Sequence, residues 1–325
     1  MNKRSAIIGV GSFLPEKIIT NHDLSQLVDT THDWIVSRTG IHQRHVAGDH
    51  EKTSDLALAA CKKALKSSGR GVDDLDFIIC ATTTPDQIFP STSTRLQGLL
   101  GMSKGFAFDI QAVCGGFIYA LAVANNFITT GQAQRGIVVG AETMSRLLDW
   151  NDRSTAILFG DGAGAVVLEA RDGAGSLADF GILKTFLHSD GQLNDILQMT
   201  EGPGSGTCFG TMIMKGQDVF RHAVEKLGGA IEEMLSDTGL TADDIDWFVP
   251  HQANERIIDA LVKRFDFPSH KVIKTVSLHA NTSAASIPLA LDAAVMDGRI
   301  KKGDLVLLDA LGAGLTWGSA LVRWG

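Results

Sequence analysis

The chain has 325 residues, 44% of them hydrophobic, and carries 29 Lys and Arg against 37 Asp and Glu, a formal net charge of −8. This composition is typical of a packed globular protein, excludes disorder and a collagen repeat, and argues against general nucleic-acid binding. A chain of this length exceeds what one hydrophobic core normally supports, so two core-forming units or one duplicated unit are expected.

The beginning of the chain, MNKRSAIIGVGSFLPE, predicts a first strand rather than a signal peptide, because glycines interrupt its apolar stretch and no cleavage site follows. No segment approaches the roughly 18 to 20 uninterrupted apolar residues of a membrane span. The four cysteines contain no C-x-x-C pair and are too few for a disulfide framework. We therefore expect a protein of the reducing cytoplasm without a membrane partner.

Further along, the chain repeats itself. The segment SGRGVDDLDFIICATTTP (68–85) aligns without gaps with TGLTADDIDWFVPHQANE (238–255). A second match, slightly out of register with the first, places Cys114 opposite Asn281 and aligns two glycines behind each of them. Each half of the chain is therefore expected to repeat one structural plan.

That plan is a helix, a strand, a second helix and a glycine-led strand. The expected ranges are 54–67, 76–82, 114–130 and 136–141 in the first copy, and 218–235, 246–250, 281–297 and 303–308 in the second. Alternating strands and helices imply mostly parallel sheets, and the second helix of each copy is apolar around its circumference. We expect these helices between two sheets, in a layered α-β-α-β-α body divided into residues 1–172 and 173–325.

Cys114 is the strongest candidate for a reactive residue. It lies where the alternating strand GFAFDIQAV ends and an inner helix begins, and two glycines follow it. A helix start favours thiolate over thiol, and its free N–H groups can stabilise an oxyanion. The other three cysteines, Cys61, Cys80 and Cys208, are interpreted as small core residues.

His251 and Asn281 occupy matching places in the second copy. His251 follows the apolar strand WFVP, and Asn281 opens the segment NTSAAS before an inner helix. A structural histidine and a simple helix cap are the alternative interpretations. A neutral histidine beside a side-chain amide would direct two hydrogen-bond donors at one oxygen, which suits an enolate formed from a thioester.

No cofactor is expected from the glycine or histidine patterns. GVGSFL (9–14) lacks a third glycine and a following helix, and FGDGAGAVVLE (159–169) is a tight turn that leads into a strand, so neither predicts a dinucleotide site. His42 and His45 have no nearby partner set of carboxylates and histidines, so we expect surface residues and no metal.

Together these features resemble β-ketoacyl-[acyl-carrier-protein] synthase III. The similarity rests on the Cys114 helix start, PHQAN with His251, NTSAAS with Asn281 and the closing GLTWGSALVRW, and it extends over essentially the whole chain. It implies a thiolase-like duplicated fold, a homodimer, and initiation of type II fatty-acid synthesis by decarboxylative condensation. The substrates implied are an acyl-CoA primer, with acetyl-CoA favoured, and malonyl-acyl carrier protein.

The resemblance also implies residue roles. Cys114 would take the acyl group as a thioester, and His251 and Asn281 would hold the malonyl thioester oxygen while CO2 leaves. The backbone N–H groups of Cys114 and Ala313 would form the oxyanion hole, although the family commonly has glycine at the latter position. Phe89 would close the acyl pocket of the partner subunit, and Leu311 stands where the family often has phenylalanine.

Two further sets of residues follow from the same resemblance and from the charge pattern. The implied CoA-binding residues are Thr30, Trp34, Arg38, Arg153, Gly216 and Asn254, with the adenine between Trp34 and Arg153. A basic face that would dock the acidic carrier protein is expected from Arg221, Arg256, Lys263 and Arg264. An ordinary solvated helix face is the alternative for the second set.

Three other functions compete with this hypothesis. A related thiolase-fold enzyme of specialised metabolism would use the same acyl-Cys114 intermediate on another acceptor. A cysteine hydrolase would use Cys, His and Asn as a triad, but a buried helix and duplicated halves argue against the open cleft that a protease needs. A noncatalytic acyl-CoA-binding homologue would lack a nucleophile, and Cys114 is present.

Overall fold

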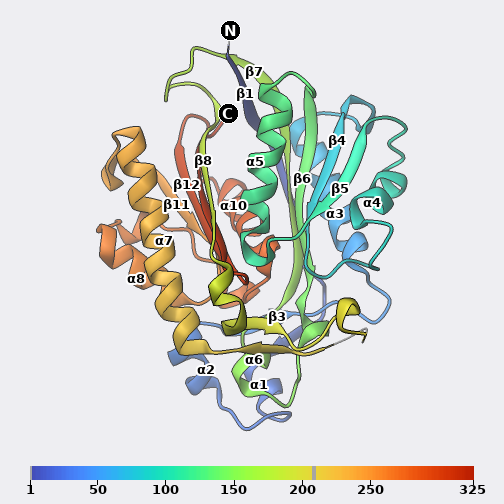
Figure 1. The fold of residues 1–325 in the computed structure, drawn as a ribbon, viewed down its shortest axis with the longest axis vertical. Coiled ribbons are helices and arrows are strands. Elements are labelled where there is room, and N and C mark those ends of the chain that lie inside the picture. The colour runs from blue at the N-terminus through green and yellow to red at the C-terminus, as the bar shows by residue number, and fades with distance from the viewer. Residues whose placement is uncertain (1, 207–209) are drawn as a thin grey trace.

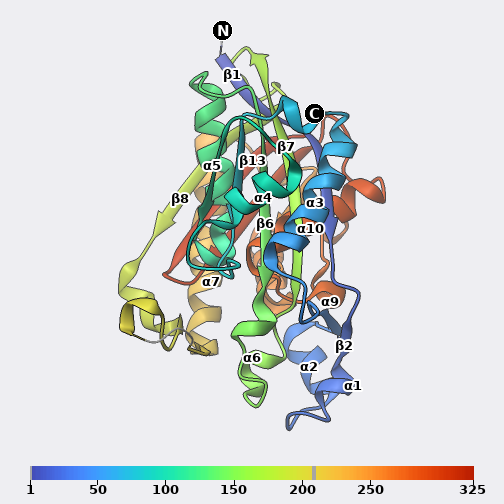
Figure 2. The ribbon, with the colours of Figure 1, turned by 90° about the vertical axis from the view of Figure 1, so that its right-hand side faces the viewer.

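The structure, a computed structural model, describes residues 2–206 and 210–325 and contains two large sheets (Figures 1 and 2). In spatial order, the strands of the first sheet are β1 (Asn2–Phe13), β7 (Asp161–Gly173), β6 (Arg135–Thr143), β4 (Phe77–Ala81) and β5 (Phe106–Ile110). Those of the second sheet are β8 (Gly181–Ser189), β13 (Thr316–Arg323), β12 (Leu305–Gly312) and β11 (Trp247–Pro250). In each sheet the first three strands pair antiparallel and the remaining pairs are parallel.

Helices fill the space between the sheets and cover their outer faces (Figure 1). The inner pair is α5 (Gly116–Thr129) and α10 (Ser286–Met296); the outer helices are α3 (Thr53–Ser68) and α4 (Thr92–Leu100) on the first sheet, and α7 (Gly216–Thr238) and α8 (Glu255–Phe265) on the second. This order of layers confirms the predicted thiolase-like α-β-α-β-α fold. The division of the chain at residue 172 stays a prediction.

Most of the shorter elements gather at one end of the layers, the lower end in Figure 1. They are β2 (Ile18–Thr20), α1 (Asn21–Leu24), α2 (His32–Thr39), β3 (Gln43–His45), α6 (Arg153–Ala156), β9 (Leu197–Met199), β10 (Met212–Met214) and α9 (Val276–His279). The 3-10 helices are η1 (Val72–Asp74), η2 (Val113–Gly115), η3 (Met144–Leu147), η4 (Gly191–Ile196), η5 (Pro203–Ser205), η6 (Ala242–Asp244), η7 (Ser269–Lys271) and η8 (Ser283–Ala285). Loops at the carboxyl ends of parallel strands are where α/β proteins place their sites.

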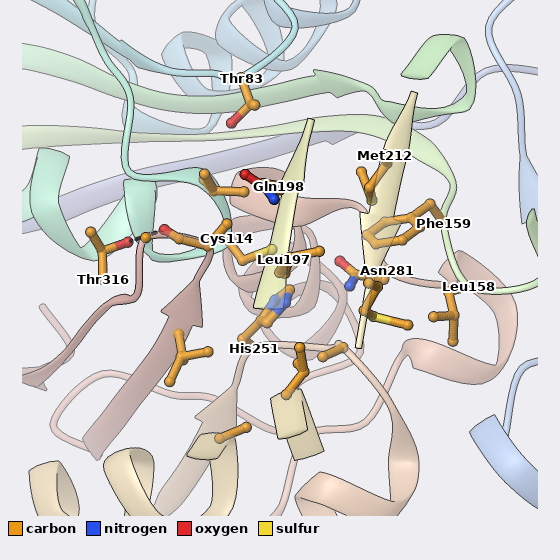
Figure 3. Close-up of a pocket in the computed structure, with 18 of the residues that line it drawn as sticks. Thr83, Cys114, Leu158, Phe159, Leu197, Gln198, Met212, His251, Asn281 and Thr316 are labelled. Carbon is orange, nitrogen blue, oxygen red and sulfur yellow. Dashed lines mark hydrogen bonds between the residues drawn. The ribbon is translucent and has the colours of Figure 1, made fainter. Parts of the chain in front are cut away.

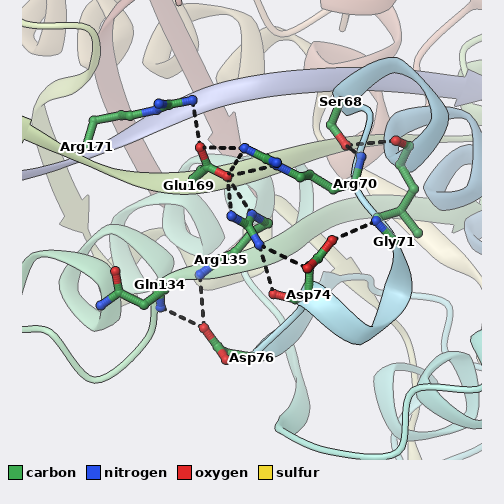
Figure 4. A network of polar contacts seen from close by, with 10 residues as sticks. Ser68, Arg70, Gly71, Asp74, Asp76, Gln134, Arg135, Glu169 and Arg171 are labelled. Atoms are coloured by element: carbon green, nitrogen blue, oxygen red, sulfur yellow. Dashed lines mark hydrogen bonds and ion pairs between the residues drawn. The ribbon is translucent and has the colours of Figure 1, made fainter.

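The repeated aspartate motif makes the same hydrogen bonds in both copies. Asp74 accepts a hydrogen bond at 2.9 Å from the N–H of Gly71, the residue before its 3-10 helix, and Asp244 accepts one at 2.8 Å from the equivalent Thr241. Asp76 accepts the N–H of the first residue of β6, and Asp246 accepts that of the first residue of β12. Figure 4 shows the first copy, where three arginines also surround the buried carboxylate of Glu169. The motif therefore joins a helix start to a strand start in each half.

The structure corrects the alignment around the inner helices. Val113 and Ser283 both have positive φ angles, 46° and 49°, and each opens the 3-10 helix before its inner helix, so these two residues correspond. Val113 and Ser283 are separated by the same number of residues as the two segments of the first sequence match. The strand register of β4 with β6 and that of β11 with β12 also coincide at this separation. The counterpart of Cys114 is therefore Ala284 and not Asn281. The predicted second match holds only at the helix ends, because α5 is longer than α10.

Several expectations about the cysteines, metals and membranes can be compared with the described ranges. Cys61 and Cys80 are fully buried between the first sheet and α3, which confirms them as core residues; Cys208 lies outside the described residues. Within residues 2–206 and 210–325, no helix is both long and apolar enough to cross a bilayer. In the same ranges, no group of three or more His, Cys, Asp and Glu side chains is arranged to hold a metal ion, and His45 instead contacts the Pro15 carbonyl.

Candidate active site

Cys114 lies on a sharply bent segment between β5 and the inner helix α5. The φ angle of 46° at Val113 is one that a β-branched residue rarely adopts. Gly312, at the end of β12, approaches so closely that a Cβ atom there would lie 2.7 Å from the Cys114 nitrogen. Strained backbone of this kind persists only where the surrounding packing imposes it, and it is concentrated at functional sites. Contacts from both halves therefore fix the position of the thiol.

The Cys114 thiol is neutral in the resting chain. Burial raises its pKa to about 12, although the Ser283 hydroxyl and the Cys114 N–H both lower it. The backbone N–H at the helix start favours the thiolate, as expected, but desolvation of the charged form outweighs it. A proton must leave the sulfur when Cys114 attacks an electrophile.

The ring of His251, directly after β11, is oriented by a serine of the inner helix α10. Nδ1 lies 2.5 Å from Ser286 Oγ, and that oxygen also accepts the Gln252 N–H at 3.4 Å. When the Ser286 hydroxyl donates to Nδ1, the ring proton is on Nε2. Burial lowers the pKa of His251 to about 3, so the ring is neutral. The cavity thus receives one N–H donor from this residue.

The side chain of Asn281 is held from one end. Its Oδ1 accepts the Ser283 N–H at 2.9 Å, just before the 3-10 helix η8, whose N-cap residue is Thr282. Its Nδ2 group makes no hydrogen bond within the part of the chain that the structure describes, and the residue lines the same cavity as His251. The bond to Ser283 therefore orients a second, unused donor.

Cys114, His251 and Asn281 all face one cavity of about 420 Å³, and Figure 3 shows them converging beneath β9 and β10. The rest of the lining is mostly apolar and includes Met144, Leu158, Phe159, Leu197, Met199, Met212, Met214, Phe220, Ala223, Leu227 and Ile257. A cavity of this size and character suits a small-molecule ligand or a slender chain. The structure therefore brings together the three predicted residues, a thiol and two neutral hydrogen-bond donors.

The loop after β12 completes this arrangement. Leu311 and Ala313 line the cavity, and the Ala313 N–H makes no hydrogen bond among the described residues. Thr316 Oγ1 donates to the carbonyls of Ala112 at 3.0 Å and Ala313 at 3.2 Å, which ties this loop to the Cys114 segment. The N–H groups of Cys114 and Ala313 thus both lack a hydrogen-bond partner among the described residues, and both residues line the cavity.

Comparison with known proteins identifies the family. The model for 3-oxoacyl-[acyl-carrier-protein] synthase III matches residues 108–191, and the model for the C-terminal part of that enzyme matches residues 235–324. A β-ketoacyl-[acyl-carrier-protein] synthase III of Paramagnetospirillum magneticum is 58% identical over 98% of this chain and 99% of its own length. The chain belongs to the β-ketoacyl-[acyl-carrier-protein] synthase III family. It is an acyltransferase of the condensing-enzyme type.

Solved structures agree with this membership. The 3-oxoacyl-[acyl-carrier-protein] synthase III of Aquifex aeolicus is 42% identical, covers 98% of this chain and 100% of its own, and superposes with a TM-score of 0.92. The priming β-ketosynthase of the R1128 polyketide pathway is 34% identical, covers 99% and 97%, and has a TM-score of 0.94. The same fold therefore occurs in a 3-oxoacyl-[acyl-carrier-protein] synthase III and in a priming ketosynthase of a polyketide pathway.

A second hollow, of about 500 Å³, continues the synthase cavity to the surface. The two hollows share Leu158, Met214, Gly216, Phe220 and Asn254. The outer one is also lined by Trp34, Arg38 and Arg256, so its mouth is aromatic and basic while its inner end is apolar. This channel contains four of the six predicted CoA-binding residues.

The other two predicted CoA-binding residues are placed differently. The Arg153 guanidinium carbon lies 5.0 Å from the centroid of the Trp34 ring, whereas a flat base between them would need a separation of roughly 7 Å. Arg153 must therefore move if an adenine is to stack there as expected. Thr30 lines neither hollow, and its hydroxyl is buried without a partner among the described residues.

The four predicted docking residues differ in whether they are ion-paired. Arg221 pairs with Asp218 at 3.0 Å, and Arg264 pairs with Glu232 at 2.7 Å. The Arg256 guanidinium lies over the Phe220 ring at 5.4 Å, at the channel mouth. Lys263 has no ion pair within the described ranges. Two of the four predicted cations therefore have no acidic partner.

Sequence reasoning missed two buried residues that support the synthase site. Ser286 orients His251, and it stands inside the quoted NTSAAS segment, so its place one turn beyond Asn281 was a usable signal. Glu142 is fully buried at the end of β6 beside the loop that carries Thr83, which lines the cavity. Nothing in the segment VVGAETMS distinguishes this glutamate from a solvated residue at a strand end.

Proposed function

We propose that this chain joins a short acyl-CoA primer, most simply acetyl-CoA, to malonyl-acyl carrier protein and so starts fatty-acid synthesis. The observation that carries the proposal is the single cavity that Cys114, His251 and Asn281 share. The products of the reaction are a 3-oxoacyl-carrier protein, CoA and CO2. No cofactor takes part, because the chemistry needs only a nucleophile, hydrogen-bond donors and substrates that are already thioesters.

In the first half-reaction, Cys114 takes the acyl group. The sulfur attacks the thioester carbonyl, and the N–H groups of Cys114 and Ala313 stabilise the tetrahedral oxyanion beside it. Collapse of this adduct expels the CoA thiolate and leaves an acyl-Cys114 thioester. Covalent catalysis thereby divides one difficult transfer into two easier steps.

In the second half-reaction, a malonyl thioester occupies the emptied channel. His251 Nε2–H and Asn281 Nδ2–H donate to its thioester oxygen, which stabilises the enolate formed when CO2 leaves. A neutral imidazole is the right donor here, because a charged one would favour protonation of the enolate over attack. The enolate carbon attacks the acyl-Cys114 carbonyl, and Cys114 is released.

The channel matches the arm that both substrates carry. Coenzyme A and the carrier protein each present their acyl group on a long phosphopantetheine chain, which needs a narrow passage with a basic outer end. Arg38 and Arg256 supply that charge at the mouth, and the acidic carrier protein would dock on the face formed by Arg221, Arg256, Lys263 and Arg264. Arg256 and Lys263 are the members of this set that have no acidic partner among the described residues.

A homodimer fits the open edge of the first sheet. β5 is an edge strand, all five of its residues are half-buried, and the nearby Phe89 is 82% exposed. An edge strand of this length with exposed aromatic neighbours would be an aggregation site if nothing covered it. Pairing of β5 with a second copy would cover the edge and place Phe89 against the partner's acyl pocket.

Condensation in specialised metabolism is the second candidate, and the similarity to the priming polyketide synthase favours considering it. The difference between the two lies in the primer. Leu311 lines the cavity where the family often has phenylalanine, which leaves more room beside Cys114 for a longer or branched acyl group.

The test is the intact mass of the protein after incubation with acetyl-CoA and with a graded series of longer acyl-CoAs. We expect an acetyl adduct at Cys114 and none on the Cys114→Ser variant. Preference for long or branched acyl groups would favour the specialised enzyme instead. If no acyl-CoA gives an adduct, the primer-loading mechanism is wrong.

A further inference from the structure

Glu142 is a fully buried carboxylate that the two half-reactions leave unused. It accepts hydrogen bonds from the Thr84 hydroxyl at 2.6 Å, from the Thr84 N–H at 3.2 Å and from the Thr83 N–H at 3.1 Å. A weaker bond comes from the Thr82 hydroxyl at 3.4 Å. These donors belong to the loop after β4, so Glu142 holds the segment that lines the cavity through Thr83.

The side chain of Glu142 points toward the inner layer, where Cys114 lies. Residues two apart on a strand share a face, so Glu142 lies on the face of β6 that also carries Gly140. A Cβ atom at Gly140 would lie 2.2 Å from the Ala284 carbonyl oxygen, which shows that the 3-10 helix η8 packs directly on this face. The first residue of η8 is Ser283, beside Ala284.

Ser283 opens η8, which packs against both β6, the strand of Glu142, and η2, the 3-10 helix of Cys114. Its hydroxyl is fully buried and has no hydrogen bond of good geometry among the described residues. It is nevertheless close enough to lower the pKa of both the Cys114 thiol and the Glu142 carboxyl. Ser283 also has a φ of 49°, so the backbone is held in a strained conformation that keeps this hydroxyl in place.

We propose that Ser283 and Glu142 form a proton path for Cys114, in which the thiol proton passes through the Ser283 hydroxyl to the Glu142 carboxylate. The inference rests on the proposed function, because it assigns the proton that must leave Cys114 when the residue is acylated. His251 then has no part in removing that proton and keeps its own Nε2–H for the malonyl oxygen. Ser283 and Glu142 act through Cys114 and do not touch the substrate.

The proton balance closes over one catalytic cycle. During loading, the S–H bond of Cys114 breaks as the sulfur–acyl bond forms; Ser283 accepts this proton and passes its own to Glu142. CoA leaves as a thiolate and is protonated by solvent. During condensation, the acyl–sulfur bond breaks, and Glu142 returns its proton through Ser283 to the released Cys114 thiolate. Glu142 therefore stores one proton for the lifetime of the acyl-Cys114 intermediate.

The surroundings of Glu142 suit this exchange. Burial raises its pKa to about 7, while the donors of the loop and of η8 oppose that rise, so both protonation states are accessible at neutral pH. Glu142 also interacts with the thiols of Cys114 and Cys80. Burial raises the pKa of the Cys80 thiol well above its ordinary value, and Asp109 and Asp86 raise it too. No other carboxylate is coupled to the Cys114 thiol among the described residues.

The rival explanation predicts the opposite sign. If Glu142 were only a nearby negative charge, it would oppose the thiolate, and its removal would make Cys114 more reactive. If the proton path operates, removal of Glu142 makes Cys114 less reactive at neutral pH. The direction of the change therefore separates the two explanations without reference to its size.

The experiment measures the rate at which iodoacetamide alkylates Cys114 in the full-length protein from pH 6 to pH 9, by intact mass. We expect Glu142→Gln and Ser283→Ala each to slow alkylation at pH 7 by about tenfold and to move the rise in rate to higher pH. The double variant should be no slower than either single one, since both interrupt the same path. A faster or unchanged rate in Glu142→Gln, or additive losses in the double variant, would overturn the proposal.

Two further measurements keep the result interpretable. Ser319→Ala removes another fully buried serine hydroxyl far along β13 and should alkylate at the wild-type rate, with Cys114→Ser giving the background from other cysteines. Thermal unfolding identifies a variant that fails to fold; Ser283→Ala then decides alone, because its hydroxyl makes no well-formed bond. Alkylation needs no acyl-CoA, so failure of primer loading in the wild-type protein would be seen separately.

Discussion

The two halves of this synthase use equivalent helix starts for different chemistry. In the first half, the segment after β5 places Cys114 before α5; in the second, the segment before α10 places Asn281 ahead of its 3-10 helix and Ser286 beneath His251. The scaffold is repeated in one constant register, but the reactive residues are not at equivalent positions. One half therefore supplies the nucleophile and the other supplies neutral donors.

The halves differ again at their sheet edges. The first sheet ends in the five-residue strand β5, whereas the equivalent place in the second sheet is reduced to a single bridge between Phe248 and Val272. A full edge strand offers a row of backbone groups for pairing, and one bridge does not. The first sheet therefore has a strand at this edge that the second sheet lacks.

The largest effect is expected from the nucleophile of the first half. Cys114→Ser should lower acyl transfer from acetyl-CoA by roughly three orders of magnitude or more, because the hydroxyl is a far weaker nucleophile without a strong base. Loading is followed by intact mass. Retention of substantial loading would show that the acyl group is accepted elsewhere.

The second half should fail at the other step. His251→Ala and Asn281→Ala are expected to load acetyl at near wild-type rates but to release CO2 from malonyl-carrier protein roughly 10² to 10³ times more slowly, the usual cost of losing one oxyanion donor. Single-turnover assays on preloaded protein measure this. Equal loss of loading in these variants and in Cys114→Ser would refute the division of roles between the halves.

The burial of His251 should make the free energy of unfolding depend on pH. Its pKa of about 3 in the folded chain lies below the ordinary 6.5, so the folded state binds fewer protons, and stability is full above pH 6.5 and falls as the pH drops toward 3. Between pH 7 and pH 5, the wild-type protein should lose about 2 kcal/mol more free energy of unfolding than His251→Asn. Urea unfolding at the two pH values checks this, and parallel curves would contradict it.

The smallest effect on the single chain is expected at the open edge. Phe89→Ser should change its free energy of unfolding by less than about 0.5 kcal/mol, because the side chain is 82% exposed. Dimerisation should weaken and the primer preference should shift toward longer acyl groups. Sedimentation velocity over a range of concentrations measures the first change; an unaltered monomer–dimer equilibrium would show that Phe89 lies outside the interface.

Much of the fold could be read from local patterns. The ranges expected for the inner helices and for the strands around 76–82 and 246–250 agree with the structure to within a few residues, because apolar periodicity reports directly on burial. The correct alignment at the starts of the inner helices could not be predicted, because the glycines used for the second match follow the ends of these helices. The difference in length between α5 and α10 puts these two alignments out of register.

By itself, the sequence determined the type of chemistry, since Cys114, His251 and Asn281 stand in motifs, such as PHQAN and NTSAAS, that resemble one enzyme family. Only the tertiary structure decided the protonation states and the supporting contacts. Burial, which depends on segments far apart in the chain, makes Cys114 a neutral thiol and His251 a neutral ring. Strand β6 and the 3-10 helix η8 come together for the same reason, because they belong to distant parts of the chain and pack against each other only in the folded protein.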